Sequence, residues 1–378
     1  MPAHHAEDEH GHVRIAVPGL PAPLRLLHLT DSHIDRGTDL GYEGSAMNFG
    51  QNMHNRYEYV TDPAASTGGR TPNHGTSFWR LQDAEGGHER NTGRPIAGSY
   101  HEIDSGPGRG QTRPHNVFEA QLQMAKADGA DLLVHTGNLV NFPSFRAVYY
   151  VWNALENSGI PYMYTSGNHD WCWQDMIGTK PVNDLRQQYC WDLSSECATL
   201  FSRTSASSVV STKQYDPKAW TELVGCVRFL GIDNSTQTVT REQLEFVEAQ
   251  LAASAGVVEP VVIVLHIPLY TPELRALLDR DVVPPNIDWD SVEVDGALCG
   301  DPQHPHASST ESDGSSTVRF IDAVCNSPHV VAVLSGHLQR SHSMPIGNAD
   351  CVQYITGAGY AGAHRWVDIV PSSDAAKL

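Results

Sequence analysis

Short clusters of acid, histidine and asparagine residues stand where apolar, strand-like runs of this chain end. In order they are Asp31-Ser32-His33, Gly137-Asn138, Gly167-Asn168-His169-Asp170 and Gly336-His337-Leu338-Gln339, with a lone His266 between the last two. In open α/β sheets, side chains at the carboxyl ends of strands meet at one edge. Acids, imidazoles and amides gathered at such an edge suit a metal-centred hydrolytic site. The pattern therefore predicts an α/β fold whose sheet edge carries hydrolytic chemistry.

Apolar runs and amphipathic segments alternate along the chain. The pattern predicts strands at residues 24–29, 131–135, 161–165, 226–232, 261–265, 330–334, 351–355 and 366–370, and helices at 116–127, 143–156, 240–251, 271–280 and 317–325. Thr240 with Gln243 forms a capping box, and Thr271 before Pro272 is a helix start. The alternation indicates a layered α/β protein. Because no linker interrupts it, we expect a polar N-terminal tail over 1–22 and a single catalytic domain over 23–378.

Three irregular stretches, about 36–114, 171–222 and 281–314, are predicted to be loop insertions. The first begins directly after Asp31-Ser32-His33 and holds eight arginines and no lysine. Because the arginine fork binds phosphate or carboxylate bidentately, the stretch is interpreted as a specificity loop; the alternative is a packed loop or an oligomer contact. The candidate substrate-binding residues are Asn52, His54, Arg56 and Tyr57 in this insertion, and Tyr360 near the C-terminus.

Composition excludes some classes of function. The formal net charge is −19, from 44 acids and 25 bases, which argues against nucleic-acid and anionic-membrane partners. No run reaches the roughly 18 apolar residues of a membrane span. The N-terminus lacks the features of a signal peptide, so we expect a cytoplasmic protein; a leader that was already removed is the alternative. Of the seven cysteines, Cys226, Cys325 and Cys351 are expected to be small core residues.

In their order along the chain, these motifs resemble those of the calcineurin-like metallophosphoesterases, which include purple acid phosphatases and many bacterial phosphodiesterases. That family's pattern is D-x-H, G-D, G-N-H-[DE], a lone His and G-H-x-H, and the resemblance covers about residues 24–339. It implies a four-layer α-β-β-α sandwich with long loop insertions. It also implies two divalent metal ions, drawn from Mn, Fe, Zn or Ni, which activate a shared water for attack on phosphorus.

The resemblance also implies a role for each motif residue. Asp31 and His33 would bind the first metal, Asn138 would bridge both, and the second would be bound by Asn168, His266 and His337. His169 would donate a hydrogen bond or proton to the phosphoester, with Asp170 holding its ring.

Two ligand positions depart from the family pattern, because Asn138 stands where the bridging aspartate is usual and Gln339 where the last histidine is usual. A neutral amide is a poorer bridge than a carboxylate, so we expect the first metal site to be weak or empty. Asn138 is open to three interpretations: a substitution made to trap a ligand, a native feature of a one-metal branch, or a native disabling change.

The resulting functional hypothesis is a metal-dependent hydrolase of a small organic phosphoester, with a phosphodiester slightly favoured over a monoester. One alternative is a catalytically weakened relative that binds a phosphorylated ligand or metal without turnover. Another is a single-metal hydrolase of a non-phosphate bond. The expected partner is a small phosphorylated substrate, and a homo-oligomer is compatible with the sequence.

Overall fold

A computed structural model describes residues 3–34, 114–140, 145–170, 219–257, 259–280, 298–302, 311–347 and 350–373. Most of the three expected insertions lies outside these ranges. The candidate substrate-binding residues Asn52, His54, Arg56 and Tyr57 are therefore outside the described residues.

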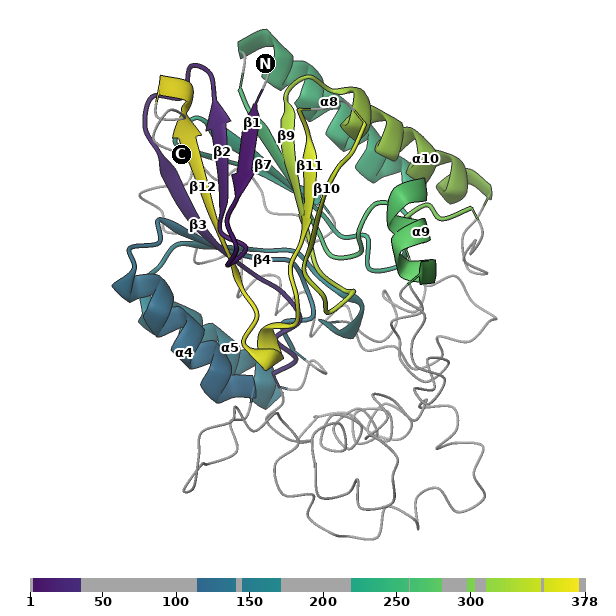
Figure 1. The fold of residues 1–378 in the computed structure, drawn as a ribbon. Helices are drawn as coiled ribbons and strands as arrows, with labels where there is room; N and C mark the ends of the chain where they lie inside the picture. The colour runs from purple at the N-terminus through teal and green to yellow at the C-terminus, as the bar shows by residue number, and fades with distance from the viewer. Residues whose placement is uncertain are drawn as a thin grey trace, which may run out of the picture.

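The first sheet has six strands and mixed directions. Their order is β1 (His4–Glu7), β2 (Val13–Val17), β12 (Arg365–Pro371), β3 (Leu24–Leu29), β4 (Leu132–His135) and β5 (Tyr162–Tyr164). The strands β3, β4 and β5 run parallel, whereas β12 pairs antiparallel with β3 and parallel with β2. Helices α4 (Pro114–Ala127) and α5 (Phe145–Ser158) pack on one face of this sheet through a buried apolar cluster (Figure 1).

The second sheet also has six strands. Their order is β10 (His342–Pro345), β11 (Val352–Ile355), β9 (Val330–Ser335), β8 (Val261–Leu265), β7 (Val227–Ile232) and β6 (Ala219–Val224). Helices α8 (Arg241–Val257) and α10 (Glu311–Asn326) cover its outer face through another apolar cluster, and α9 (Pro272–Arg280) lies beside them. Two single 3-10 turns, η2 (Asn168–Asp170) and η5 (Gly359–Ala361), complete the described elements.

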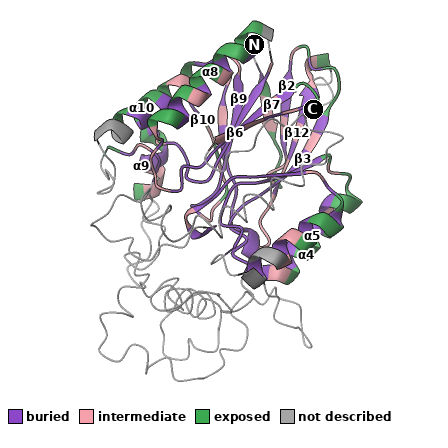
Figure 2. Cartoon of the chain, turned by 180° about the vertical axis from the view of Figure 1, so that it is seen from behind, coloured by how far each residue is buried: buried purple, intermediate pink, exposed green. Residues whose placement is uncertain are grey.

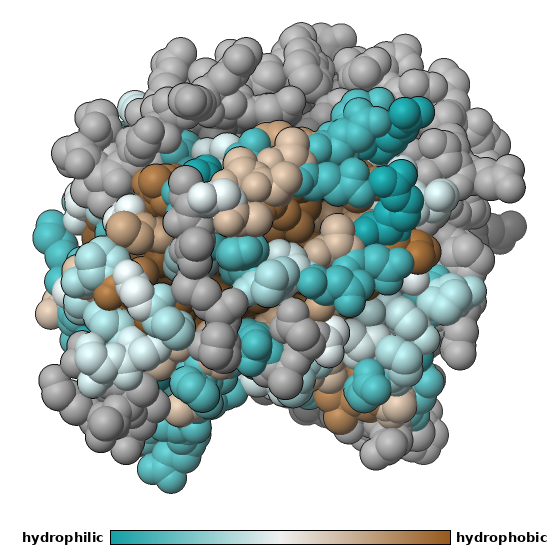
Figure 3. Space-filling view, turned by 90° about the horizontal axis from the view of Figure 1, so that it is seen from above, coloured by the Kyte–Doolittle hydropathy of each residue, from teal (hydrophilic) through white to brown (hydrophobic). Residues whose placement is uncertain are grey.

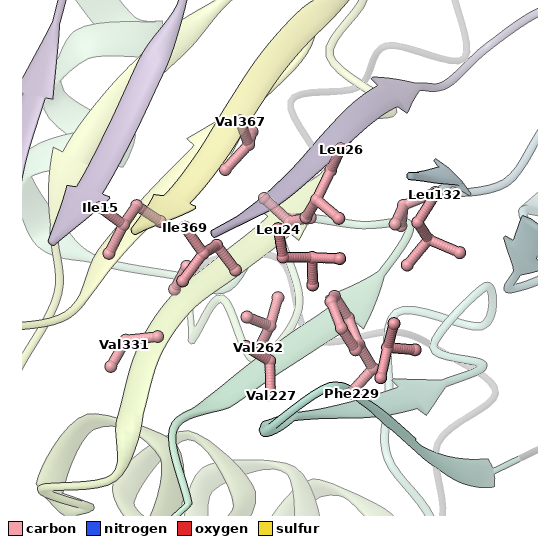
Figure 4. Close-up of a cluster of buried hydrophobic side chains, with 14 of the residues drawn as sticks. Ile15, Leu24, Leu26, Leu132, Val227, Phe229, Val262, Val331, Val367 and Ile369 are labelled. Carbon is pink, nitrogen blue, oxygen red and sulfur yellow. The ribbon is translucent and has the colours of Figure 1, made fainter. Parts of the chain in front are cut away.

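Apolar side chains of the two sheets face each other and form the central core. Figure 4 shows Leu24 and Leu26 of the first sheet pointing toward Phe229 and Val262 of the second. Strands such as β8 are buried on both faces, which explains their continuous apolar sequence. In Figure 2 the buried sheets lie between helices whose outer sides are exposed. The four-layer α-β-β-α sandwich is thereby confirmed.

The expected polar tail over residues 1–22 is wrong, because this segment supplies β1 and β2. The polar strand β1 pairs with β2 through its backbone, and His5 hydrogen bonds the Tyr354 hydroxyl at 2.7 Å. An edge strand needs no apolar alternation when backbone pairing and polar contacts hold it, so its sequence resembles a tail. Cys226, expected in the core, is exposed in the turn between β6 and β7.

Few large apolar side chains are exposed among the described residues. Val318 on α10 is their one exposed large hydrophobic side chain. Figure 3 shows the face seen from above, where hydrophilic side chains flank the apolar ones that remain visible. Within the described ranges, no helix combines the length and apolar character needed to cross a membrane.

Candidate metal and catalytic site

The motif residues come together where the carboxyl ends of strands from both sheets meet. Asp31 and His33 follow β3, Asn138 follows β4, Asn168 to Asp170 follow β5, His266 follows β8, and His337 follows β9. Several hydrogen bonds join the sheets there, among them one from His337 N to Asp31 Oδ2 at 2.8 Å and one between His266 Nδ1 and Thr136 O at 2.7 Å. Most of the set is buried, while Asn168 and Gln339 are half-buried.

The backbone is strained at these positions. Among the described residues, six non-glycine residues have positive φ, and five of them are motif residues: Asp31 (50°), His33 (43°), Asn138 (52°), His337 (67°) and Gln339 (52°). Non-glycine residues rarely adopt this region, and such strain concentrates at functional sites, where the surrounding structure enforces it. The loops after the strands are therefore shaped for side-chain placement at some loss of local stability.

Gly336 allows the second sheet to approach Asp31. A Cβ at this position would clash with Thr30 Oγ1 and lie 2.7 Å from Asp31 Oδ2. The glycine is therefore needed so that the Thr30 and Asp31 side chains can pack against its backbone, rather than for an unusual φ.

Asp31 is the most heavily bonded acid of the site. Its Oδ2 accepts hydrogen bonds from Thr30 Oγ1 and His337 N, both at 2.8 Å, and its Oδ1 accepts one from Asn138 Nδ2 at 3.1 Å. Burial alone would raise the pKa of Asp31, but the hydrogen bond with His33 and the nearby imidazoles outweigh it and lower the pKa. Asp31 is therefore an ionised carboxylate at neutral pH.

Asn138 joins Asp31 to the catalytic candidate His169. Its Nδ2 donates to Asp31 Oδ1, while its Oδ1 accepts the His169 backbone N–H at 2.9 Å. The oxygen that the family pattern assigns to metal bridging is thus bonded to the backbone.

His266 is held as a neutral imidazole with a defined tautomer. Burial lowers the pKa of His266 to about 4. The Thr136 carbonyl can only accept, so Nδ1 carries the ring proton and Nε2 presents a lone pair toward Asn168 Oδ1, 3.1 Å away. The His337 ring lies beside it, with centroids 5.1 Å apart.

The contact between His266 Nε2 and Asn168 Oδ1 tests whether a metal ion fits this site. Two acceptor atoms facing each other at 3.1 Å repel unless a cation lies between them, and this spacing suits two ligands of one divalent ion bound at about 2.1 Å. Asn168, His266 and His337 together offer the mixed N/O donors of a transition metal. Within the described residues, no three His, Cys, Asp or Glu side chains converge as a metal site, so this one depends on an asparagine oxygen.

The site contains two further predicted residues, His169 and Asp170. The His169 ring packs edge-on against His33, with centroids 4.6 Å apart. Asp170 was expected to hold the His169 ring, but its oxygens accept hydrogen bonds from Val140 N at 2.9 Å and Gly167 N at 2.8 Å. Burial raises the pKa of Asp170 to about 6 against these bonds. Asp170 therefore fixes the loops after β4 and β5.

Tyr360 is placed differently from its predicted role in substrate binding. Its side chain is buried, its hydroxyl donates to Gln339 Oε1 at 2.9 Å, and its ring lies 5.7 Å from that of His33. The hydrogen bond engages the very amide oxygen that was considered as a ligand to the first metal.

Sequence reasoning missed the two threonines that support the site. Thr30 donates to Asp31, and the Thr136 carbonyl fixes the His266 ring. Each directly precedes a motif, which is the signal that could have identified them. The buried His28 ring hydrogen bonds the Thr136 hydroxyl at 2.9 Å through its Nε2.

Comparison with known proteins agrees with the motif order. Residues 24–340 match the family model of calcineurin-like phosphoesterases. Solved structures with similarity include a purple acid phosphatase from yellow lupin (14% identity, 92% of this chain and 46% of that one, TM-score 0.42). A dimetal phosphatase from Danio rerio is also similar (11% identity, 66% of this chain and 82% of that one, TM-score 0.38). No curated protein matches the chain significantly in sequence.

Proposed function

Because the chain belongs to the calcineurin-like phosphoesterase family, we propose that it is a metal-dependent hydrolase of a small organic phosphoester, with a diester favoured over a monoester. The observation that carries the proposal is the placement of Asn168, His266 and His337 beside His169 at the meeting of the two sheets. A small phosphorylated molecule is the proposed partner.

The described residues divide the chemical work among them. Asn168, His266 and His337 would hold a divalent cation, which supplies Lewis acidity toward a phosphate oxygen and makes water more acidic. The Thr136 carbonyl keeps the lone pair of His266 Nε2 directed into the site. His169, whose backbone is fixed by Asn138, would stabilise charge on the transferring phosphoryl group or protonate the leaving oxygen.

The second candidate function is phospho-ligand binding without turnover. Its support is that the Asn138 and Gln339 oxygens are bonded to His169 N and the Tyr360 hydroxyl. A relative with one disabled metal position would bind phosphate but hydrolyse it slowly or not at all.

The test is hydrolysis of bis-p-nitrophenyl phosphate and p-nitrophenyl phosphate by the full chain with added Mn²⁺. We expect turnover of the diester, and a loss of activity of at least about 100-fold in His266→Ala. Losing a hydrogen-bond partner of a metal ligand typically costs about 10–100-fold, and losing the ligand itself should cost more. His329→Ala is the matched control, since His329 precedes β9 at the end opposite His337. Binding of phosphate without turnover would favour the second candidate, and neither binding nor turnover would contradict both.

A further inference from the structure

The atoms around Asp31 form a closed hydrogen-bonded group. Three donors lie within hydrogen-bond distance of the Asp31 carboxylate: Thr30 Oγ1, His337 N and Asn138 Nδ2, at 2.8, 2.8 and 3.1 Å. The buried His33 Nε2 lies farther away, 3.6 Å from Asp31 Oδ1. Because all three are protein groups, the carboxylate is satisfied in its buried position without a cation.

The chemistry of position 138 decides this arrangement. An aspartate here would place a second carboxylate oxygen beside Asp31 Oδ1, and two buried carboxylates repel unless a cation lies between them. The Asn138 amide instead presents N–H groups to Asp31 at 3.1 Å and turns its oxygen to His169 N. One side chain thus neutralises the contact and fixes the catalytic loop.

Gln339 is engaged in the same way. Its Oε1 accepts the Tyr360 hydroxyl at 2.9 Å, and Tyr360 N in turn donates to Asp31 O at 3.1 Å. The two positions that depart from the family pattern therefore have their side-chain oxygens bonded within the protein.

The residues expected to bind the second metal, Asn168, His266 and His337, differ from this arrangement, because two of their acceptor atoms face each other without a donor between them. His266 Nε2 and Asn168 Oδ1 face each other as acceptors at 3.1 Å, an arrangement that a cation stabilises. The two expected metal sites thus differ. At Asp31 protein donors satisfy the acceptor atoms, whereas at His266 and Asn168 a cation would do so.

We propose that the Asn138 amide takes the place of a cation beside Asp31, so that this chain holds a single divalent ion, on Asn168, His266 and His337. The inference rests on the proposed function and deepens it, because the hydrolysis would then be a one-metal reaction. Asn138 is a positioning residue that holds Asp31 and the His169 backbone.

For the experiment the full chain is loaded with Mn²⁺, and the unbound Mn²⁺ is removed. The metal content per chain and the EPR spectrum are then measured. We expect one ion per chain and the spectrum of isolated Mn²⁺. Asn138→Asp is expected to bind two ions with an exchange-coupled spectrum. Its metal-free form should melt below the unchanged protein, and Mn²⁺ should restore its Tm.

Asn326→Asp is the control, because it makes the same change at the last residue of α10, before β9 begins and therefore at the end opposite His337. Asn326 Nδ2 donates only to Asp322 O of its own helix, at 2.8 Å, among the described contacts. This variant is expected to bind one ion.

Each outcome has a distinct meaning. Two ions in the unchanged chain, or one ion in a folded Asn138→Asp, would overturn the inference. The first of these needs no variant, so it remains decisive if Asn138→Asp does not fold. One ion without hydrolysis would overturn the proposed function alone, and no bound ion would overturn both.

Discussion

Glu222 is a carboxylic acid in an apolar environment, and it should make the stability of the fold depend on pH. It lies on β6 between Trp220 and Val224, which both belong to the core between the sheets. Its side chain is buried, and its Oε2 has no hydrogen-bond partner among the described residues. Burial raises the pKa of Glu222 from 4.5 to about 7.

The direction in which stability changes with pH follows from proton linkage. Because the pKa of Glu222 is higher in the folded state than in the unfolded chain, the folded state retains the proton between about pH 4.5 and 7. The contribution to stability is fully present below pH 4.5 and is lost as the pH rises through 7. The pKa difference corresponds to about 3 kcal/mol as an upper bound, and β6 is an edge strand near solvent, so we expect about 1–2 kcal/mol.

The assay is urea unfolding at pH 5 and pH 8. Between these values the unchanged protein should lose about 1–2 kcal/mol more free energy of unfolding than Glu222→Gln, which cannot ionise. Contributions from all other groups are common to both proteins and cancel in the comparison. Glu156→Gln, a change at an exposed position of α5, should behave like the unchanged protein. An equal loss in the unchanged protein and Glu222→Gln would refute the reasoning.

Three further predictions concern the site. Gly336→Ala should destabilise the protein by about 1–3 kcal/mol in urea unfolding, since the new Cβ clashes with Thr30 Oγ1, whereas Gly256→Ala in α8, with open space around it, should not. Tyr360→Phe removes the hydrogen bond to Gln339 and should lower the free energy of unfolding by about 1 kcal/mol; no change would mean that water replaces the hydroxyl. Removing Mn²⁺ with a chelator should lower the Tm, because a bound ion stabilises the folded state by about 2.7 kcal/mol when its free concentration is 100 times Kd. An unchanged Tm would argue against a bound ion.

Much of the sandwich could be predicted because its central strands are apolar on both faces. The run Val261–Leu265 was predicted to be a strand and is confirmed as β8. The capping box is also confirmed, since Thr240 N donates to Gln243 Oε1 and Gln243 N donates to Thr240 Oγ1. Of the four strands that were missed, β1, β6 and β10 lie at sheet edges, whereas β2 pairs with β1 on one side and β12 on the other. In β6 the charged Glu222 interrupts the apolar alternation, and β1 contains no apolar alternation at all.

The sequence predicted that the motif residues lie close together, but not how they are hydrogen-bonded. Strand ends place Asp31 and Asn138 at one edge of the first sheet, and His266 and His337 at one edge of the second. Packing of the two sheets then brings these edges together, as the His337 N to Asp31 Oδ2 hydrogen bond shows. The sequence could not reveal which way each amide is turned. That the Asn138 oxygen accepts from His169 N, and that Asp170 bonds backbone rather than a ring, depends on loop geometry after the strands.

The position of β12 has a consequence for the order in which the protein forms during synthesis. β12 lies between β2 and β3, so these two early strands join one sheet only through residues 365–371. A nascent chain that has already emerged past His337 still lacks the strand that connects them. Synthesis must therefore have passed residue 371 before the first sheet can close. Until then β2 and β3 each expose an unpaired edge, which can be bound by chaperones or by another nascent chain.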